Sequence, residues 1–465
     1  MSEFLLCSNI VPMLSNRNLG QSDCDAERLY LDFDSFFASA EQHFNPDLRG
    51  KPVGVVPLDS PHTGCIAISR EAKALGVPSG ASIKDARQIA PQMIFVVARP
   101  DAYVRLHTRI LVAIETCLPV AKVRSIDEVV CHLLPSEAQD AASLAQRIKR
   151  VLAERFSSGL TCSIGIAKTE LLAKISAEMS KPDGFMLLRT VELPERIESL
   201  ALNNLPGISK GIEARLNAAG IRDIQALWSV ERKHARALWG SVEGERFWSE
   251  LHGHHVERPP TTKGMFGHSR NLPPDWRSSD KVRICARQLA LGAARRLRRT
   301  DNKASKLTVS LRGDRYRRSA NPNDCKLRWS CEVPFSPAHD DQTILLALTA
   351  ALSCSSREVS FTPRSVSVTL HGLAVDTDVQ QDLFAAASDL EPGQPVAAET
   401  QRRERLSKAM DQMRASHGPK AASFGPPEEL PGGYLGAKIA FGRIPDEQDF
   451  SEAPTKDEAT HFCSF

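Results

Sequence analysis

The sequence predicts a multidomain protein of mixed α/β class, from its length, its periodicities and its composition. A chain of 465 residues is long enough for two to four domains. Short apolar runs of strand length alternate with amphipathic stretches of helix length through much of the chain. Hydrophobic residues make up 42% of the chain and charged residues 25%, which is typical of a globular protein with buried cores.

In chain order, the first half begins with an extension and continues as a mixed region. Residues 1–26 have no clear periodicity, and we expect them to be irregular. Residues 27–190 combine strands, the first at Arg28–Leu31, with amphipathic helices over Asp101–Leu118 and Ala141–Arg155.

The second half is predicted to hold a helical segment and then a second α/β segment. Residues 191–258 have a helical pattern throughout. Residues 262–373 combine a helix over Asp280–Arg299 with strands that include Leu307–Leu311 and Ser365–Leu370.

The charge of the chain is unevenly placed, although its formal net value is only +3. Lys281–Ser330 holds fifteen Lys or Arg residues against three acids, whereas the segment from Asp376 to the end holds nine basic and sixteen acidic residues. Phosphate neutralisation depends on local contacts, so the basic stretch is a candidate DNA-binding module. The region 374–465, rich in Pro, Gly and acids, predicts a tail that is at best partly ordered.

Composition also bears on the cellular compartment. No apolar run approaches the ~20 residues that a membrane-spanning helix needs, and the segment that begins at Met1 lacks the basic start and long apolar core of a secretory signal. The eleven cysteines are scattered without Cys-x-x-Cys spacing, which indicates reduced thiols rather than a zinc site or disulfide framework. We expect a cytoplasmic protein.

Two acidic clusters carry the strongest chemical signal. Leu31–Phe37 reads LDFDSFF, and Ser125–Glu128 reads SIDE, with Asp127 lying 95 residues after Asp32. Carboxylates at the ends of neighbouring strands can converge, and three close anions require a cation, for which Mg²⁺ is suited. A two-metal site of this kind supports phosphoryl transfer. The alternative for either cluster alone is a set of ordinary strand-end acids on a solvated rim.

With a third motif, these clusters resemble the Y-family (translesion, UmuC/DinB-like) DNA polymerases. The Asp-x-Asp-x-Phe-Phe run and Ser-Ile-Asp-Glu are followed by Gly165–Lys168, Leu172–Lys174 and Met179–Gly184, in the family's order and spacing. The resemblance is close over residues 27–260 and holds only in outline over the next hundred or so.

The resemblance implies a right-hand polymerase. Residues 27–190 would form an α/β palm with fingers inserted at about 36–100, and 191–258 the helical thumb. The stretch 262–373 would form an α/β little finger that binds DNA, and 374–465 a C-terminal tail.

The family's catalytic carboxylates match Asp32, Asp127 and Glu128. These would bind two Mg²⁺ ions together with the backbone carbonyl of Phe33, whereas Asp34 would be structural. Phe37 matches the steric gate, whose ring occupies the space that a ribose 2′-hydroxyl would need. Phe36 beside it is carried as a nucleotide-binding candidate, and ordinary core packing is the alternative for both rings.

The family's triphosphate contacts are only partly present. Lys73 and Lys181 match basic positions that contact the incoming nucleotide. The usual Thr-x-x-Tyr-x-x-Arg is replaced here by Ala67, Arg70 and Lys73, and we expect Arg70 and Ser69 as substitutes, although Lys cannot copy a bidentate Arg.

DNA-binding candidates lie in the thumb and in the basic stretch. Leu205–Ile212 resembles a helix-hairpin-helix, whose Gly-rich turn offers backbone N–H groups to a phosphate. Three histidines, His252, His254 and His255, are spaced like metal ligands, but we expect an ordinary surface role for them. The DNA-binding candidates are Gly207, Ser209, Gly211, Arg295, Arg296, Arg298, Arg299, Arg312 and Arg315.

A short peptide in the tail suggests a protein partner. Gln380-Gln381-Asp382-Leu383-Phe384 resembles the Gln-x-x-Leu-Phe peptide by which bacterial polymerases bind the sliding clamp, with Gln380, Leu383 and Phe384 as the contacting residues. Tethering such a peptide just past a folded domain raises its effective concentration.

The function that these features predict is template-directed DNA synthesis across damaged DNA, with low fidelity and no proofreading. The predicted partners are primer-template DNA, deoxynucleoside triphosphates, the sliding clamp and accessory mutagenesis proteins, with the enzyme a monomer and no membrane involved. Two alternatives remain open. One is a catalytically weak or inactive adaptor that binds DNA and clamp for another polymerase, and the other is a nuclease, which fits the motif order poorly.

Overall fold

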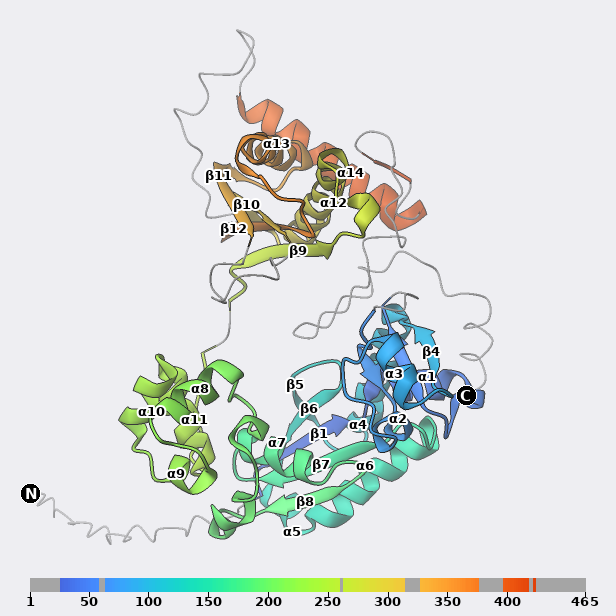
Figure 1. Cartoon of the computed structure of the whole chain (residues 1–465), viewed down its shortest axis with the longest axis vertical. Coiled ribbons are helices and arrows are strands. Elements are labelled where there is room, and N and C mark those ends of the chain that lie inside the picture. The colour runs from blue at the N-terminus through green and yellow to red at the C-terminus, as the bar shows by residue number, and fades with distance from the viewer. Residues whose placement is uncertain are drawn as a thin grey trace, which may run out of the picture.

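The structure, a computed structural model, describes residues 26–57, 63–259, 262–313, 327–375, 396–417 and 421–423. Within these, a blue-to-green body holds the N-terminal half and a yellow-to-red domain holds the C-terminal half (Figure 1). None of the helices in the part of the chain that the structure describes is long and apolar enough to cross a membrane.

A five-stranded sheet forms the centre of the body. Its strand order is β5 (Val120–Val123), β6 (Glu128–His132), β1 (Arg28–Phe33), β7 (Cys162–Ala167) and β8 (Phe185–Leu188). Strand β1 is antiparallel to both neighbours, and β7 and β8 are parallel. Helices α4 (Pro100–Glu115) and α6 (Ala141–Arg155) confirm the two amphipathic helices predicted there. Helices α1 (Phe36–Phe44), α5 (Pro135–Gln139) and α7 (Glu170–Met179) also belong to this half.

Alternation along β1 decides which side chains meet which helices. Leu29, Leu31 and Phe33 lie in one hydrophobic cluster with residues of α4 and α6, whereas Tyr30 lies in another cluster with residues of α7. Because side chains two apart share a face of a strand, Asp32 lies on the α7 side of the sheet with Tyr30.

A smaller sheet lies beside the main one. It has the order β3 (Ala67–Ile68), β2 (Val53–Val56) and β4 (Ile94–Val97), and α2 (Arg70–Ala74) and α3 (Ile83–Ile89) accompany it. Its residues form most of a small core of their own, whereas the rings at the start of α1 belong to the core of the main sheet. Helix α1 also contacts β2 and β3, and the fingers insertion at about 36–100 stays a prediction.

The predicted helical segment is confirmed, and its core is continuous with the main sheet. It contains α8 (Lys210–Ala218), α9 (Ile224–Trp228), α10 (Arg232–Trp239) and α11 (Val242–Leu251). Leu216 and Phe247 from these helices share a hydrophobic cluster with Tyr30 and Val130 of the main sheet.

The C-terminal domain is a four-stranded antiparallel sheet covered by helices. Its strand order is β11 (Arg328–Ala338), β10 (Asn302–Arg312), β12 (Ser365–Val375) and β9 (Met265–Asn271). Helices α12 (Ser279–Arg298) and α13 (Asp341–Glu358) pack on one face and form its core with the strands. The helix and the two strands predicted from the sequence are confirmed.

The tail contains a helix, α14 (Val396–His417), that the sequence did not lead us to expect. It packs against the helical side of the C-terminal domain, next to α13 (Figure 1). Its covered face is mostly polar, because the residues that recur at helical spacing there are Arg403, Glu404, Ser407, Met410, Asp411 and Arg414. The missing apolar stripe explains why hydrophobic periodicity gave no signal.

Two predictions fall outside the described residues. These are the irregular extension, apart from Ala26, and the clamp-binding peptide Gln380–Phe384. The seven cysteines within the described ranges are all free thiols, as expected.

Candidate functional site

The two acidic clusters meet at one edge of the main sheet. Asp32 at the end of β1 pairs in register with Glu128 at the start of β6, so the two side chains share a face of the sheet. Asp127 lies in the loop before β6, where its carbonyl accepts a hydrogen bond of 2.9 Å from the N–H of Phe33. The Ser125 hydroxyl donates to the Asp127 carboxylate. Segments 95 residues apart in the sequence thus place three acidic residues at one edge of the sheet.

Helix α7 packs on this face of the sheet. It comes close to the sheet at Gly165 of β7, which pairs in register with Tyr30 of β1. A Cβ at Gly165 would come within 2.1 Å of the Ala173 carbonyl oxygen. Any larger residue would therefore push α7, and the lysines on and after it, away from the carboxylates.

Two lysines from this helix and the loop after it pair with the carboxylates. The Lys181 ammonium lies 2.9 Å from the Asp32 carboxylate, and Lys174 pairs with Glu128. Burial raises the pKa of Asp32 to about 7, against the opposing effect of the Lys181 charge. Burial likewise raises the pKa of Asp127, and the Ser125 hydrogen bond opposes it. A cation in this site would favour the charged carboxylates.

Asp34 is structural, as expected. Its side chain is buried and accepts hydrogen bonds from the Thr161 and Ser163 hydroxyls at 2.9 Å and from the Asp183 N–H at 2.8 Å. It therefore ties the end of β1 to β7 and to the loop that carries Lys181.

The donor set fits Mg²⁺, which prefers hard oxygen ligands from a few carboxylates. Asp32, Asp127 and Glu128 supply such oxygens at one strand edge. As placed, no three His, Cys, Asp or Glu side chains among the described residues form a ready metal shell. Two of the three carboxylates pair with lysines in this arrangement.

The two phenylalanines after Asp34 are both largely buried. Phe37 stacks on Tyr103 with ring centroids 4.7 Å apart, and Phe36 contacts Phe33 and Phe37. The Tyr103 hydroxyl donates to Glu41 at 2.7 Å, which fixes the ring that supports Phe37. Phe37, held in this way on the first turn of α1, remains the candidate steric gate.

Ser69 cannot serve as the substitute hydroxyl for the nucleotide. It is the N-cap of α2 and fully buried, where it accepts from the Val53 and Ala72 N–H groups and donates to the Lys51 carbonyl. Its residue type is explained by helix capping. Arg70 is half-buried and Lys73 exposed on the same short helix, so these two stay as candidates.

The predicted thumb turn combines a glycine of positive φ with a capped helix start. Gly207 has φ +96°, a conformation that favours glycine, and Ser209 caps α8 by accepting from the Ile212 N–H. Gly211 is exposed in the first turn of α8. An exposed helix start presents backbone N–H groups to a phosphate.

Arg298 does not belong among the DNA-binding candidates. It is buried and pairs with Asp341 and Asp411, both at 2.7 Å, and donates to the His339 carbonyl. It therefore joins α12, α13 and α14 inside the domain. Of the other candidates, Arg295 and Arg296 are half-buried, Arg299 and Arg312 are exposed, and Arg315 lies outside the described residues.

A second set of polar residues was missed from the sequence. On the face of the C-terminal sheet away from α12 and α13, Ser330, Ser310, Ser367 and Ser269 pair in register across all four strands. We call this the serine row. Beside it, Arg328 pairs in register with Arg312. Alternation of serine or threonine with apolar residues along β10 and β12 was the available signal.

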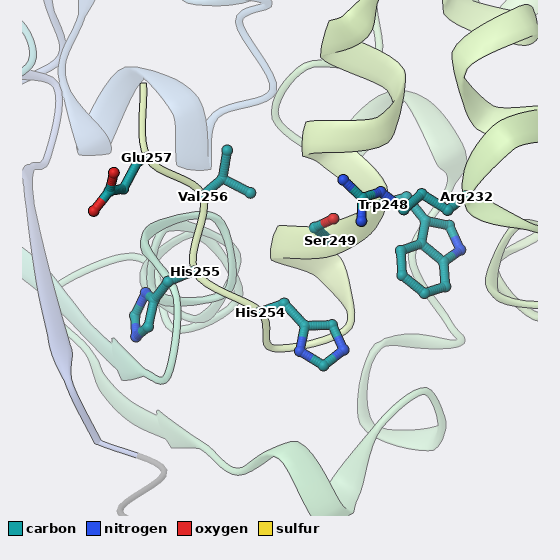
Figure 2. Close-up of a pocket in the computed structure, with 7 residues that line it drawn as sticks. All are labelled: Arg232, Trp248, Ser249, His254, His255, Val256 and Glu257. Atoms are coloured by element: carbon teal, nitrogen blue, oxygen red, sulfur yellow. The ribbon is translucent and has the colours of Figure 1, made fainter. Parts of the chain in front are cut away.

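The three histidines behave differently from one another. His252 stacks between Trp228 and Trp248, at 4.1 and 4.0 Å, and burial lowers its pKa. His254 and His255 line a pocket of about 480 Å³ after α11 (Figure 2), and His255 also pairs with Glu27 at 2.6 Å. These contacts make the segment a joint between thumb and palm rather than a plain surface.

Comparisons with known proteins agree with this arrangement. The impB/mucB/samB family matches residues 31–178, and the C-terminal domain of that family matches residues 264–383. The DNA polymerase IV of Moorella thermoacetica is 30% identical over 85% of this chain and 94% of its own length. That of Halorhodospira halophila is 29% identical over 77% of this chain and 98% of its own length.

The fold agrees as well. A solved Y-family DNA polymerase chimera of Dbh and Dpo4 superimposes with a TM-score of 0.62 at 23% identity, covering 75% of this chain and 99% of the chimera. That likeness concerns the fold alone, whereas the family follows from the sequence matches. The chain therefore belongs to the impB/mucB/samB family, the UmuC/DinB-like Y-family of DNA polymerases.

Proposed function

We propose that this protein is a template-directed DNA polymerase that copies damaged DNA with low fidelity and without proofreading. The observation that carries the proposal is the register that sets Asp32 opposite Glu128, with Asp127 beside them. The relatives named DNA polymerase IV support the same activity.

In this proposal the carboxylates hold two Mg²⁺ ions, with the Phe33 carbonyl as a further oxygen ligand. Mg²⁺ held by these residues would supply activation of the primer hydroxyl and neutralisation of charge on the transferring phosphoryl group. Lys181, which pairs with Asp32 in this structure, would provide positive charge for the triphosphate. Arg70 and Lys73 would provide further positive charge from the fingers. Phe37 excludes the 2′-hydroxyl of a ribonucleotide.

DNA would be held by sequence-independent contacts. The turn at Gly207–Gly211 offers N–H groups to a phosphate, and Arg312 and Arg328 flank the serine row on the open face of the C-terminal sheet. Short hydroxyl side chains can donate to backbone oxygens without reading bases. Binding of a sliding clamp through Gln380–Phe384 remains a prediction from the sequence.

Primer extension with Mg²⁺ and deoxynucleotides tests the proposal. An Asp127→Ala/Glu128→Ala variant should lose extension by about a thousandfold or more, because ligands of both ions are removed. A Glu195→Ala/Glu198→Ala variant, which changes two exposed acids elsewhere, should extend like the wild type.

Fluorescence anisotropy with labelled primer-template serves as the folding check for all three proteins. Extension that survives the double alanine change would contradict the placement of the metal site. A folded, DNA-binding wild type that never extends a primer would point to the adaptor instead.

A further inference from the structure

Lys174 is a charged residue beside the metal site to which the resemblance assigns no role. It lies on α7, one side of which faces the sheet edge that carries the carboxylates, and its ammonium pairs with Glu128. Its Nζ also lies 5.2 Å from the centre of the Tyr30 ring. Burial, and after it the charge of Glu128, raise the pKa of the Tyr30 hydroxyl, so Tyr30 also lies near this carboxylate.

The position of Lys174 is secured by its helix. Glu170, four residues earlier and therefore on the same side of α7, pairs with Arg124 in the strand-to-loop segment before Asp127. Glu178, four residues later, lies 2.8 Å from Lys181. One side of α7 thus follows the acidic edge along its whole length and holds Lys174 against Glu128.

We propose that Lys174 is a resident counter-cation of the metal site, which balances Glu128 in the nucleotide-free enzyme and keeps the affinity of the empty site for divalent cations low. The inference rests on the proposed metal site. Three carboxylates at one strand edge repel one another, and the ammoniums of Lys174 and Lys181 lower that repulsion. A metal ion that enters must then bind against two positive charges.

An incoming nucleotide would affect Lys181 and Lys174 differently. Lys181 matches a triphosphate-binding position, so an incoming nucleotide would draw its charge away from Asp32. Lys174 has no triphosphate to move to, and it keeps its pairing with Glu128 beside the Tyr30 ring. The triphosphate, with its own negative charge, then restores the affinity for metal, so ions and nucleotide enter together.

Mn²⁺ binding measured by electron paramagnetic resonance, without nucleotide or DNA, tests the inference. Lys174→Met keeps the length of the side chain and removes its charge, and it should bind Mn²⁺ about fivefold more tightly or better, because one nearby positive charge is gone. Lys174→Arg keeps the charge and should match the wild type. Lys84→Met, at an exposed position on α3, is the matched control for loss of a lysine.

The direction of the change in Mn²⁺ affinity distinguishes this role from simple positioning of Glu128. If Lys174 only oriented Glu128, Lys174→Met would bind Mn²⁺ equally or more weakly, and that result overturns the proposal. If thermal unfolding shows that Lys174→Met is not folded, Lys174→Gln, a second neutral variant, tests the same expected increase in Mn²⁺ affinity. Mn²⁺ binding by wild type that persists in Asp127→Ala/Glu128→Ala would instead overturn the proposed metal site.

Discussion

Asp34 shows how a single acid beside a metal site can be wholly structural. Its carboxylate accepts from two hydroxyls and one backbone N–H, all within 2.9 Å. Asp34→Ala should lower the free energy of unfolding by about 3 kcal/mol, because the buried Ser163 hydroxyl and two partly buried donors lose their acceptor. Urea denaturation measures the change, with Asp275→Ala, an exposed acid, as control. Equal losses in the two variants would show that these hydrogen bonds contribute nothing.

Phe37 supports a prediction about sugar selection. Phe37→Val removes most of the ring that stacks on Tyr103, and we expect ribonucleotide insertion to rise by about tenfold or more relative to deoxynucleotide insertion. Single-nucleotide insertion kinetics provide the ratio, and Phe185→Val on β8 is the control. A ratio unchanged from wild type would mean that Phe37 is only a core residue.

At the residue scale, the sequence predicted those roles that depend on a short motif. It misled where the role of a side chain depends on whether that side chain is buried. The carboxylates and Asp34 follow from short motifs. Ser69 attracts attention for its hydroxyl and Arg298 for its charge, but neighbours distant in sequence use both groups inside the fold. No pattern within one segment reveals such partners.

Among the elements, α14 carries a prediction about stability. Arg298→Met removes the cation that Asp341 and Asp411 share, and leaves Asp341 buried without that partner. We expect the C-terminal domain to lose about 3–5 kcal/mol and α14 to become accessible to proteases. Chemical denaturation with limited proteolysis tests both, and Arg299→Met, one residue on but exposed, is the control. Unchanged proteolysis would show that α14 is held by other contacts.

Elements with apolar periodicity were predicted well, and the exceptions are physical. Helix α6 coincides with the amphipathic run Ala141–Arg155, and β10 and β12 contain the two strands expected in the C-terminal domain. Helix α14 escaped because it docks through ion pairs and hydrogen bonds instead of an apolar stripe. The pairing order of strands also lies beyond single-sequence patterns, since it depends on contacts between distant segments.

For the whole molecule, the two arginines beside the serine row lead to a prediction about DNA binding. An Arg312→Ala/Arg328→Ala variant should bind primer-template more weakly, and the slope of log affinity against log salt should become shallower by about 0.9 for each phosphate that is no longer neutralised. An Arg402→Ala/Arg405→Ala variant changes two exposed arginines on α14, at the helical side, and should keep the slope. Anisotropy titrations of the wild type and both variants at several salt concentrations measure these slopes. A slope altered only by the α14 variant would place DNA on the opposite face.

The sharing of cores between domains has a consequence for movement. Among the described residues, thumb helices and main sheet bury side chains in one cluster, whereas the C-terminal domain has a cluster to itself. Close-packed side chains cannot slide past one another without opening gaps between them, so the angle between thumb and palm resists change. The C-terminal domain can turn as a rigid body at no such cost. Room for a bulky or misaligned template would therefore come from the little finger turning aside, while Asp32, Asp127 and Glu128 keep their geometry.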